Sequence, residues 1–180
     1  GRHLDEFPLD VFQGGAGTST NMNANEVIAN RGLELLGLPR GRYDALHPND
    51  DVNCSQSTND VYPTAIRIAI LRSQERLGQA LERLAGELDG RAESFAEVIK
   101  LGRTQLQDAV PMTLGQEFQA FAATLREDVA RMGEIAALFR EINLGGTAIG
   151  TGINASREYQ SLAVAELGRI TGLDLAPAGN

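Results

Sequence analysis

The feature that most constrains the fold is a pair of long helical patterns with large apolar residues at spacings of three, four and seven. Residues 63–89 carry the first pattern, at Ile66, Ile70, Leu77, Leu81, Leu84 and Leu88. Residues 112–141 carry the second, in which Phe118, Leu125, Met132 and Phe139 lie seven residues apart. Such spacings place the apolar side chains along one side of each helix. Each helix would extend about 40 Å at roughly 1.5 Å per residue.

A long helix with one apolar seam is not stable alone in water, so the seams must pair with each other or with other chains. We therefore expect a mainly α-helical (all-α) fold of long antiparallel helices in a bundle. Residues 102–111 are expected to form an extended, partly irregular connection between them, and the glycine-rich residues 143–154 a loop. A shorter helix is expected over 161–170, ended by Gly172.

The first 60 residues are rich in Gly, Asn, Ser and Thr, which indicates a loop-rich N-terminal part. A helix should follow "GAGTST", with Thr18 or Ser19 as its cap and with apolar positions at Met22, Ile28, Leu35 and Leu36. Composition therefore divides the chain near residue 60, into a loop-rich part over 1–60 and a helical part over 61–180.

Charge and composition exclude several classes of partner. The chain has 180 residues and a net charge of −8, which disfavours nucleic acid and anionic membranes because both bind basic surfaces. No apolar run is long enough to cross a bilayer. Cys54 is the single cysteine, so no intrachain disulfide can form, and a cytoplasmic location is expected. With no histidine nearby in the sequence, Cys54 is expected to be a packed thiol.

Three segments concentrate small hydroxyls, amides and glycines: 14–26, 47–60 and 102–108. Such groups hydrogen-bond a carboxylate without neutralising it, and a helix N-terminus adds a favourable dipole. Together the segments suit a small dicarboxylic acid. Singly, each has an ordinary explanation: a turn at "GAG", a cap by Asn59 or Asp60 before Pro63, or an ion pair of Arg103 with Asp108.

The residues of these segments and their order along the chain resemble the fumarase/aspartase superfamily over nearly the whole chain. The resemblance rests on "GAGTSTNMNANEVIANR", "HPNDDVNCSQSTNDVYPTA", "GRTQLQDAVPMTLGQEF" and "LGGTAIGTGIN". Within the superfamily, "QGGAGTS" and "GRTQLQDAVPM" look like the aspartate ammonia-lyase (aspartase) branch. Class II fumarases typically read "TGSGTQ" and "GRTH", so Ala16 replaces their serine and Gln105 their histidine.

The resemblance implies roles for individual residues. Thr18, Ser57, Thr58 and Asn59 would bind a substrate carboxylate or amine, and Thr104 and Gln105 would contact the α-carboxylate or amino end. In fumarases the "HPND" segment forms a secondary anion site, which would here comprise His47, Asn49 and Asp50.

The reaction implied is the reversible β-elimination of ammonia from L-aspartate, through an aci-carboxylate intermediate, to give fumarate. It needs no cofactor, and the sequence has no ligand cluster with metal spacing. Two alternatives stay open. The protein would be a class II fumarase that hydrates fumarate to L-malate, or a catalytically silent helical assembly module.

The resemblance also implies that the chain is a fragment. The family's catalytic base is a serine on a flexible downstream loop that these residues lack, so no catalytic residue is assigned here and the fragment is expected to be inactive alone. Family subunits are longer and form homotetramers whose active sites are shared by three chains. Further copies of the protein are therefore expected partners, beside the dicarboxylate substrate.

Overall fold

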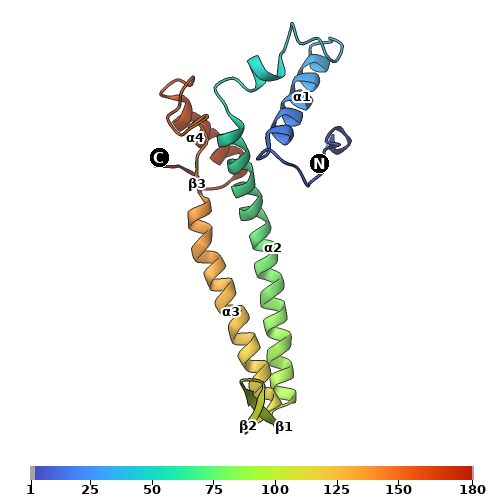
Figure 1. The fold of residues 1–180 in the computed structure, drawn as a ribbon, viewed down its shortest axis with the longest axis vertical. Coiled ribbons are helices and arrows are strands. Elements are labelled where there is room, and N and C mark those ends of the chain that lie inside the picture. The colour runs from blue at the N-terminus through green and yellow to red at the C-terminus, as the bar shows by residue number, and fades with distance from the viewer. Residues whose placement is uncertain (1–2, 180) are drawn as a thin grey trace. The chain divides into compact units, whose positions relative to one another are not determined.

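The computed structural model describes residues 3–179, which form two compact units. The first unit comprises residues up to Ile68 and those from Arg140 onward, and the second is Ala69–Phe139. Helix α2, Thr58–Ser94, begins in the first unit and continues into the second (Figure 1). The domain division expected at residues 60 and 61 concerns the longer protein and stays a prediction.

The second unit is a pair of antiparallel helices joined by a β-hairpin. The later part of α2 lies beside α3, Leu114–Phe139, and strands β1, Ile99–Thr104, and β2, Gln107–Thr113, connect them (Figure 1). Gln74 donates a hydrogen bond to the Met132 carbonyl at 2.7 Å, and Arg126 pairs with Asp89. The predicted antiparallel helices are confirmed. The connection is extended, as expected, and forms a β-hairpin whose pairing is irregular between Leu101 and Arg103.

The predicted boundaries of the second long helix were wrong by two residues at each end. Met112 and Thr113 belong to the hairpin, where they pair with Lys100 and Ile99. The Thr113 hydroxyl then accepts a hydrogen bond from the Gln116 N–H at 3.1 Å, which starts the helix as a side-chain cap. At the other end, β3, Glu141–Ile142, pairs in parallel with β4, Ala176–Pro177.

Helix α2 begins before Pro63, which therefore lies inside the helix and not in the expected position near its start. A proline inside a helix cannot donate to the carbonyl four residues earlier. That carbonyl belongs to Asn59, and it accepts a hydrogen bond from the Asn143 side chain at 2.8 Å. A contact from a distant part of the chain thus satisfies the carbonyl that Pro63 leaves unpaired.

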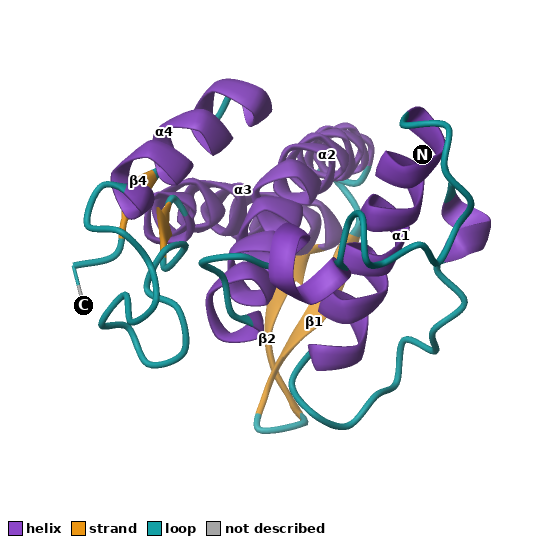
Figure 2. Cartoon of the chain, turned by 90° about the horizontal axis from the view of Figure 1, so that it is seen from above, coloured by secondary structure: helices purple, strands orange, loops and turns teal. Residues whose placement is uncertain are grey.

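The first unit contains the two shorter helices, α1, Thr18–Leu35, and α4, Tyr159–Thr171 (Figure 2). Short helical turns span Leu4–Glu6 and Pro48–Val52. Gly172, with φ 71°, ends α4 as predicted. Residues 143–154 form the expected loop.

Two expectations for α1 were wrong. Its N-cap is Gly17, in a left-handed conformation with φ 88°, and neither Thr18 nor Ser19 caps it. Its buried face is formed by residues four apart, whereas Ile28 is 55% exposed and Leu35 and Leu36 are also exposed. The buried residues are Asn21, Asn25, Ala29 and Leu33. Two of the four are amides, so apolar periodicity alone selected the wrong face.

Cys54 was expected to be packed, but its side chain is exposed. The residue follows the short turn Pro48–Val52 in an irregular segment before α2. Its sulfur lies 3.9 Å from the Ser55 hydroxyl.

The second unit buries little apolar surface of its own. Within Ala69–Phe139, all of which the structure describes, the apolar side chains classed as buried are Ala85 and Ala122. Larger apolar residues stay substantially exposed along both helices, among them Ile70, Leu77, Leu84, Phe121, Ile135 and Leu138. Since two helices with such exposed seams are weakly stabilised by their own contacts, the seams are suited to further helices.

The close approach of α3 to the end of α2 gives a test of this packing. A Cβ added at Gly115 would overlap the Ala92 carbonyl oxygen and lie 3.0 Å from the Ala96 backbone, whereas one at Gly133 would meet nothing within 4 Å. We predict that Gly115→Ala destabilises the protein by about 1–3 kcal/mol through overpacking. Gly133→Ala, in the same helix, should stabilise it by up to about 1 kcal/mol. Urea unfolding measures both; equal effects would contradict the packing described.

Candidate functional site

The N-terminal ends of α1 and α2 lie together in the first unit. Gly17, the residue before α1, packs so closely against Tyr62 of α2 that a Cβ there would overlap the aromatic ring. One turn further along α1, Asn21 donates a hydrogen bond to the Thr58 hydroxyl at 3.0 Å. With Gly17 beside Tyr62 and Asn21 beside Thr58, the two helices run antiparallel here, and the N-terminus of α2 lies beside the second turn of α1. A helix N-terminus carries partial positive charge and favours an anion in front of it.

The start of α2 is organised by a reciprocal cap. The Asn59 N–H donates to the Ser57 hydroxyl at 3.2 Å, and the Ser57 N–H donates to the Asp60 carboxylate at 2.9 Å. Asp60 thus takes part in the cap, as the sequence suggested, although Ser57 is the residue that begins it. Because the Ser57 oxygen accepts within the cap, its own O–H proton is available to donate to a ligand.

Asp60 connects this cap to the glycine-rich loop. Its side chain is fully buried, and its second oxygen accepts hydrogen bonds from Gly145 N at 3.1 Å and Thr147 N at 2.8 Å. Gly145 has φ 89°, and a Cβ there would lie 2.7 Å from Gln160. The carboxylate therefore fixes residues 145–147 against the first turn of α2.

Asn59 strengthens the same connection. Its side-chain amide donates to the Ala148 carbonyl at 2.9 Å, while its own carbonyl accepts from Asn143. One amide hydrogen is therefore occupied within the protein. The side-chain oxygen and the other hydrogen are what Asn59 can offer to a substrate.

A cluster of asparagines lies behind Thr58. Asn21 and Asn25, from α1, each donate a side-chain N–H to Asn53 Oδ1, at 3.3 and 3.0 Å. Both are almost fully buried, at 5% and 4% exposure, while Thr58 is half-buried. None of the three asparagines was selected from the sequence, and the available signal was the spacing of four between Asn21 and Asn25.

Tyr159, at the start of α4, lies near the segment that leads into α2. Burial raises the pKa of its hydroxyl above the ordinary value near 10, and electrostatic interactions with Asp60 and Cys54 raise this pKa further. A hydrogen bond with Gln56 acts in the opposite direction. The neutral phenol is therefore the form that the first unit favours.

Thr18 is exposed at the first turn of α1, and its hydroxyl donates to the Gly15 carbonyl at 3.1 Å. It precedes Asn21 by three residues and so lies on the same side of the helix. Ala16 just before it has φ 53°, a conformation uncommon for residues other than glycine. The structure therefore brings Thr18, Ser57, Thr58 and Asn59 to the two adjacent helix ends.

Thr104 and Gln105 lie in the second unit, on the β-hairpin. Thr104 pairs with Gln107, so that Gln105 and Leu106 form the two-residue turn, with φ 48° and 63°. Positive φ at both positions is typical of a type I′ turn. Arg103 pairs with Asp108 at 3.2 Å beside the turn, as the sequence suggested. Thr104 and Gln105 are both exposed.

His47 caps the turn Pro48–Val52, where its Nδ1 accepts from the N–H groups of Asn49 and Asp50 at 3.2 and 3.1 Å. Nδ1 also lies 3.5 Å from the Asp50 carboxylate, which would be an ion pair if this nitrogen carried a proton. An acceptor nitrogen carries none, so the cap is the interaction that this geometry supports. Whether His47, Asn49 and Asp50 bind an anion stays a prediction.

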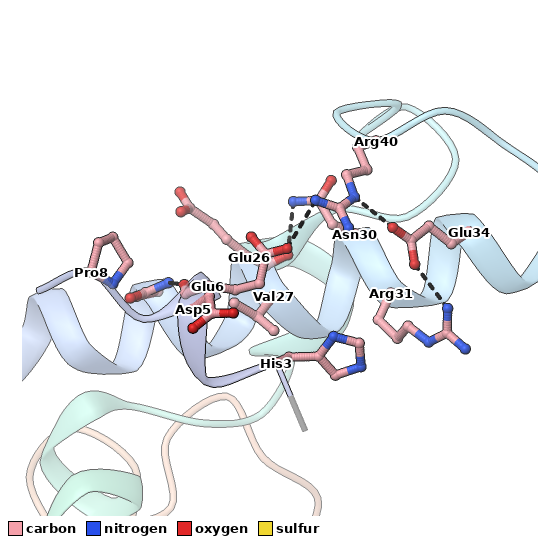
Figure 3. Close-up of a pocket in the computed structure, with 11 residues that line it drawn as sticks. His3, Asp5, Glu6, Pro8, Glu26, Val27, Asn30, Arg31, Glu34 and Arg40 are labelled. Atoms are coloured by element: carbon pink, nitrogen blue, oxygen red, sulfur yellow. Dashed lines mark hydrogen bonds and ion pairs between the residues drawn. The ribbon is translucent and has the colours of Figure 1, made fainter. Parts of the chain in front are cut away.

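A separate pocket of about 260 Å³ lies beside α1, and sequence reasoning did not select it (Figure 3). Arg40 in this pocket pairs with Glu34 at 2.5 Å and with Glu6 at 3.0 Å. Hydrogen bonds with Glu34, and then with Glu6, raise the pKa of Arg40 above its ordinary value. Because two carboxylates already neutralise the guanidinium, this pocket is a poorer place for a dicarboxylate than the helix ends.

Within residues 3–179, no group of three or more His, Cys, Asp or Glu side chains is placed to hold a metal ion. No helix over the same residues has the length and apolar character needed to cross a membrane.

The fold places the chain among mainly α-helical proteins built on long antiparallel helices. A family model described as a lyase matches residues 1–180. The chain therefore belongs to this lyase family.

Known proteins resemble the chain closely over a part of their length. It is 59% identical over 177 residues to an aspartate ammonia-lyase of Pseudomonas canavaninivorans and 54% identical over 178 residues to that of Escherichia coli. The matches cover 98% and 99% of this chain but 37% of each relative.

Solved structures show the same fold. A fumarate lyase:delta crystallin from Brucella melitensis, bound to cobalt, matches with TM-score 0.91 and 66% identity, over 100% of this chain and 39% of that one. A class II fumarase from Schistosoma mansoni matches with TM-score 0.82 and 36% identity, over 100% and 41%. The mainly α-helical fold expected from the sequence is thereby confirmed.

The buried carboxylate of Asp60 gives a test of the site's construction. We predict that Asp60→Asn destabilises the protein by about 1–3 kcal/mol, because an amide NH₂ would face backbone N–H donors and leave a buried donor unpaired. Asp50→Asn is the control, since the Asp50 side chain is 84% exposed, and should change stability by less than about 0.5 kcal/mol. Urea unfolding followed by circular dichroism measures the difference, and equal stabilities would contradict the role given to Asp60.

Proposed function

We propose that the chain is the carboxylate-binding section of an aspartate ammonia-lyase, which converts L-aspartate to fumarate and ammonia. The observation that carries the proposal is the N-terminus of α2, with the hydroxyls of Ser57 and Thr58, packed beside the first two turns of α1. The identity of 54–59% to aspartate ammonia-lyases supports this substrate.

The chemistry follows from where negative charge develops. A base removes a proton from Cβ of aspartate, and the electron pair of the C–H bond moves into the adjacent carboxylate to give the aci-carboxylate. The pair then returns to form the C=C bond, while the C–N bond breaks and its electrons leave with nitrogen. Donors fixed before the reaction stabilise the added charge most effectively. We assign this role to the Ser57 and Thr58 hydroxyls at the α2 N-terminus.

The remaining contacts are assigned by the resemblance and by chemistry. Thr18 would bind the same end of the substrate from α1 by turning the hydroxyl that otherwise donates to the Gly15 carbonyl. The Asn59 side-chain oxygen would accept from the substrate amine. Thr104 and Gln105 would hold the α-carboxylate or amino end, and Gln105 is neutral at every pH. The base itself is expected on a serine of the longer protein.

Self-association is part of the proposal. The exposed apolar residues of α2 and α3 support burial against further helices. We infer that the whole protein forms a homotetramer, a cytoplasmic enzyme as the sequence predicts. A protein that assembles but converts no substrate would instead be the silent helical module.

Substrate identity can be decided by one absorbance assay. The whole protein is incubated with L-aspartate and separately with L-malate, and fumarate is followed in the ultraviolet. The proposal requires fumarate from L-aspartate. Fumarate from L-malate alone would identify a fumarase, the class of the Schistosoma mansoni protein to which the chain is 36% identical.

The role of the Thr58 hydroxyl gives a quantitative prediction. Thr58→Val keeps the volume and removes the donor, and we expect a loss of about 1–3 kcal/mol of transition-state stabilisation, or roughly tenfold to a hundredfold in kcat/KM for L-aspartate. Thr104→Val should behave in the same way.

Thr124→Val is the matched control, because the Thr124 hydroxyl is exposed on α3 and donates to the Ala120 carbonyl at 3.0 Å. Its kcat/KM should stay at the wild-type value. Wild-type kinetics in Thr58→Val would remove this residue from the site.

A further inference from the structure

The asparagine cluster behind Thr58 has a fixed hydrogen-bond direction. Asn53 Nδ2 donates to the Gln56 carbonyl at 3.4 Å, and a backbone carbonyl can only accept. The other side-chain atom, Asn53 Oδ1, consequently faces α1. It is an acceptor, so Asn21 and Asn25 must turn their NH₂ groups toward it.

The second N–H of Asn21 then determines what the Thr58 hydroxyl can do. It reaches Thr58 Oγ1 at 3.0 Å, and the threonine oxygen therefore accepts on its protein side. A hydroxyl that accepts from behind keeps its own proton for another partner. The direction of the Thr58 O–H is thus set by the Gln56 carbonyl, which orients Asn53 and, through it, Asn21.

We propose that Asn21 is a positioning residue that keeps the Thr58 O–H directed as a donor toward the substrate carboxylate. This inference rests on the proposed function, and it adds a residue that does not itself touch substrate. A carboxylate accepts hydrogen bonds and cannot donate them. If the Thr58 O–H donated toward the protein interior, it could not donate to the substrate carboxylate. Orientation before binding also avoids reorganisation when charge develops.

Asn25 distinguishes this role from a purely structural one. It lies one turn along the same helix, is equally buried, and donates to the same atom of Asn53. Its side-chain hydrogen bond goes to Asn53 and not to Thr58. Substitution of either asparagine should therefore destabilise the cluster. Only substitution of Asn21 should also change the direction of the Thr58 O–H.

The experiment compares Asn21→Asp with Asn25→Asp in the whole protein. Each substitution keeps the side-chain shape and replaces two donors by an acceptor. A carboxylate at position 21 would accept the Thr58 O–H and turn it inward. We expect kcat/KM for L-aspartate to fall about tenfold to a hundredfold more in Asn21→Asp than in Asn25→Asp. Succinate is a dicarboxylate without the amine. Its inhibition constant should rise more in Asn21→Asp than in Asn25→Asp.

A double-mutant cycle isolates the mechanism. In the Thr58→Val background there is no hydroxyl to orient, so Asn21→Asp should cause little further loss of kcat/KM. Asn25→Asp should have the same effect in both backgrounds. Additive losses for Asn21→Asp and Thr58→Val would overturn the inference.

Two further outcomes are distinguishable. If the wild-type protein neither converts L-aspartate nor binds succinate, the proposed function fails and this inference falls with it. If the wild-type protein is active and the two aspartate variants are equally impaired, only the inference falls. Where Asn21→Asp does not fold, Asn21→Ser and Asn25→Ser replace the pair. The short neutral serine at position 21 cannot span Asn53 and Thr58, so the same ordering is expected.

Discussion

The arrangement of the first unit depends on the buried carboxylate of Asp60. It accepts backbone N–H groups from Ser57 on one side and from Gly145 and Thr147 on the other. These donors come from segments more than 80 residues apart in the sequence. Because leaving any of them unpaired in the interior would be costly, the carboxylate fixes both segments in one geometry. The first turn of α2, where the candidate carboxylate-binding hydroxyls lie, is held from behind by this contact.

Other polar interactions act in the same direction. Pro63 leaves the Asn59 carbonyl without its helical partner, and Asn143 supplies one from the glycine-rich loop. On the opposite side, Asn21 and Asn53 fix Thr58 from α1 and the segment before α2. Buried polar groups specify geometry because each has few acceptable partners. The second unit exposes apolar side chains along both of its long helices, which accords with stabilisation by further helices.

Periodicity identified the helices because apolar spacing is a local property, and it gave both long helices and their antiparallel arrangement. It failed at Met112 and Glu141, where strand pairing with distant residues decides the backbone. It also failed on α1, whose buried face carries two asparagines that a hydrophobic pattern cannot detect. The resemblance selected Thr18 and Thr58, which the structure places on adjacent helix ends. Asn53, Asn143 and Asp60 gain their importance from contacts between segments, and no local pattern encodes those contacts.

The central claim is that the adjacent ends of α1 and α2 bind a carboxylate. A crystal structure of the whole protein with succinate tests it most directly. The account predicts a carboxylate oxygen within about 3 Å of Thr58 Oγ1, in front of the α2 N-terminus, with Asn21 still donating to Thr58 from behind. Succinate bound elsewhere, for example at Arg40, with no contact to Thr58 at saturating concentration, would contradict it.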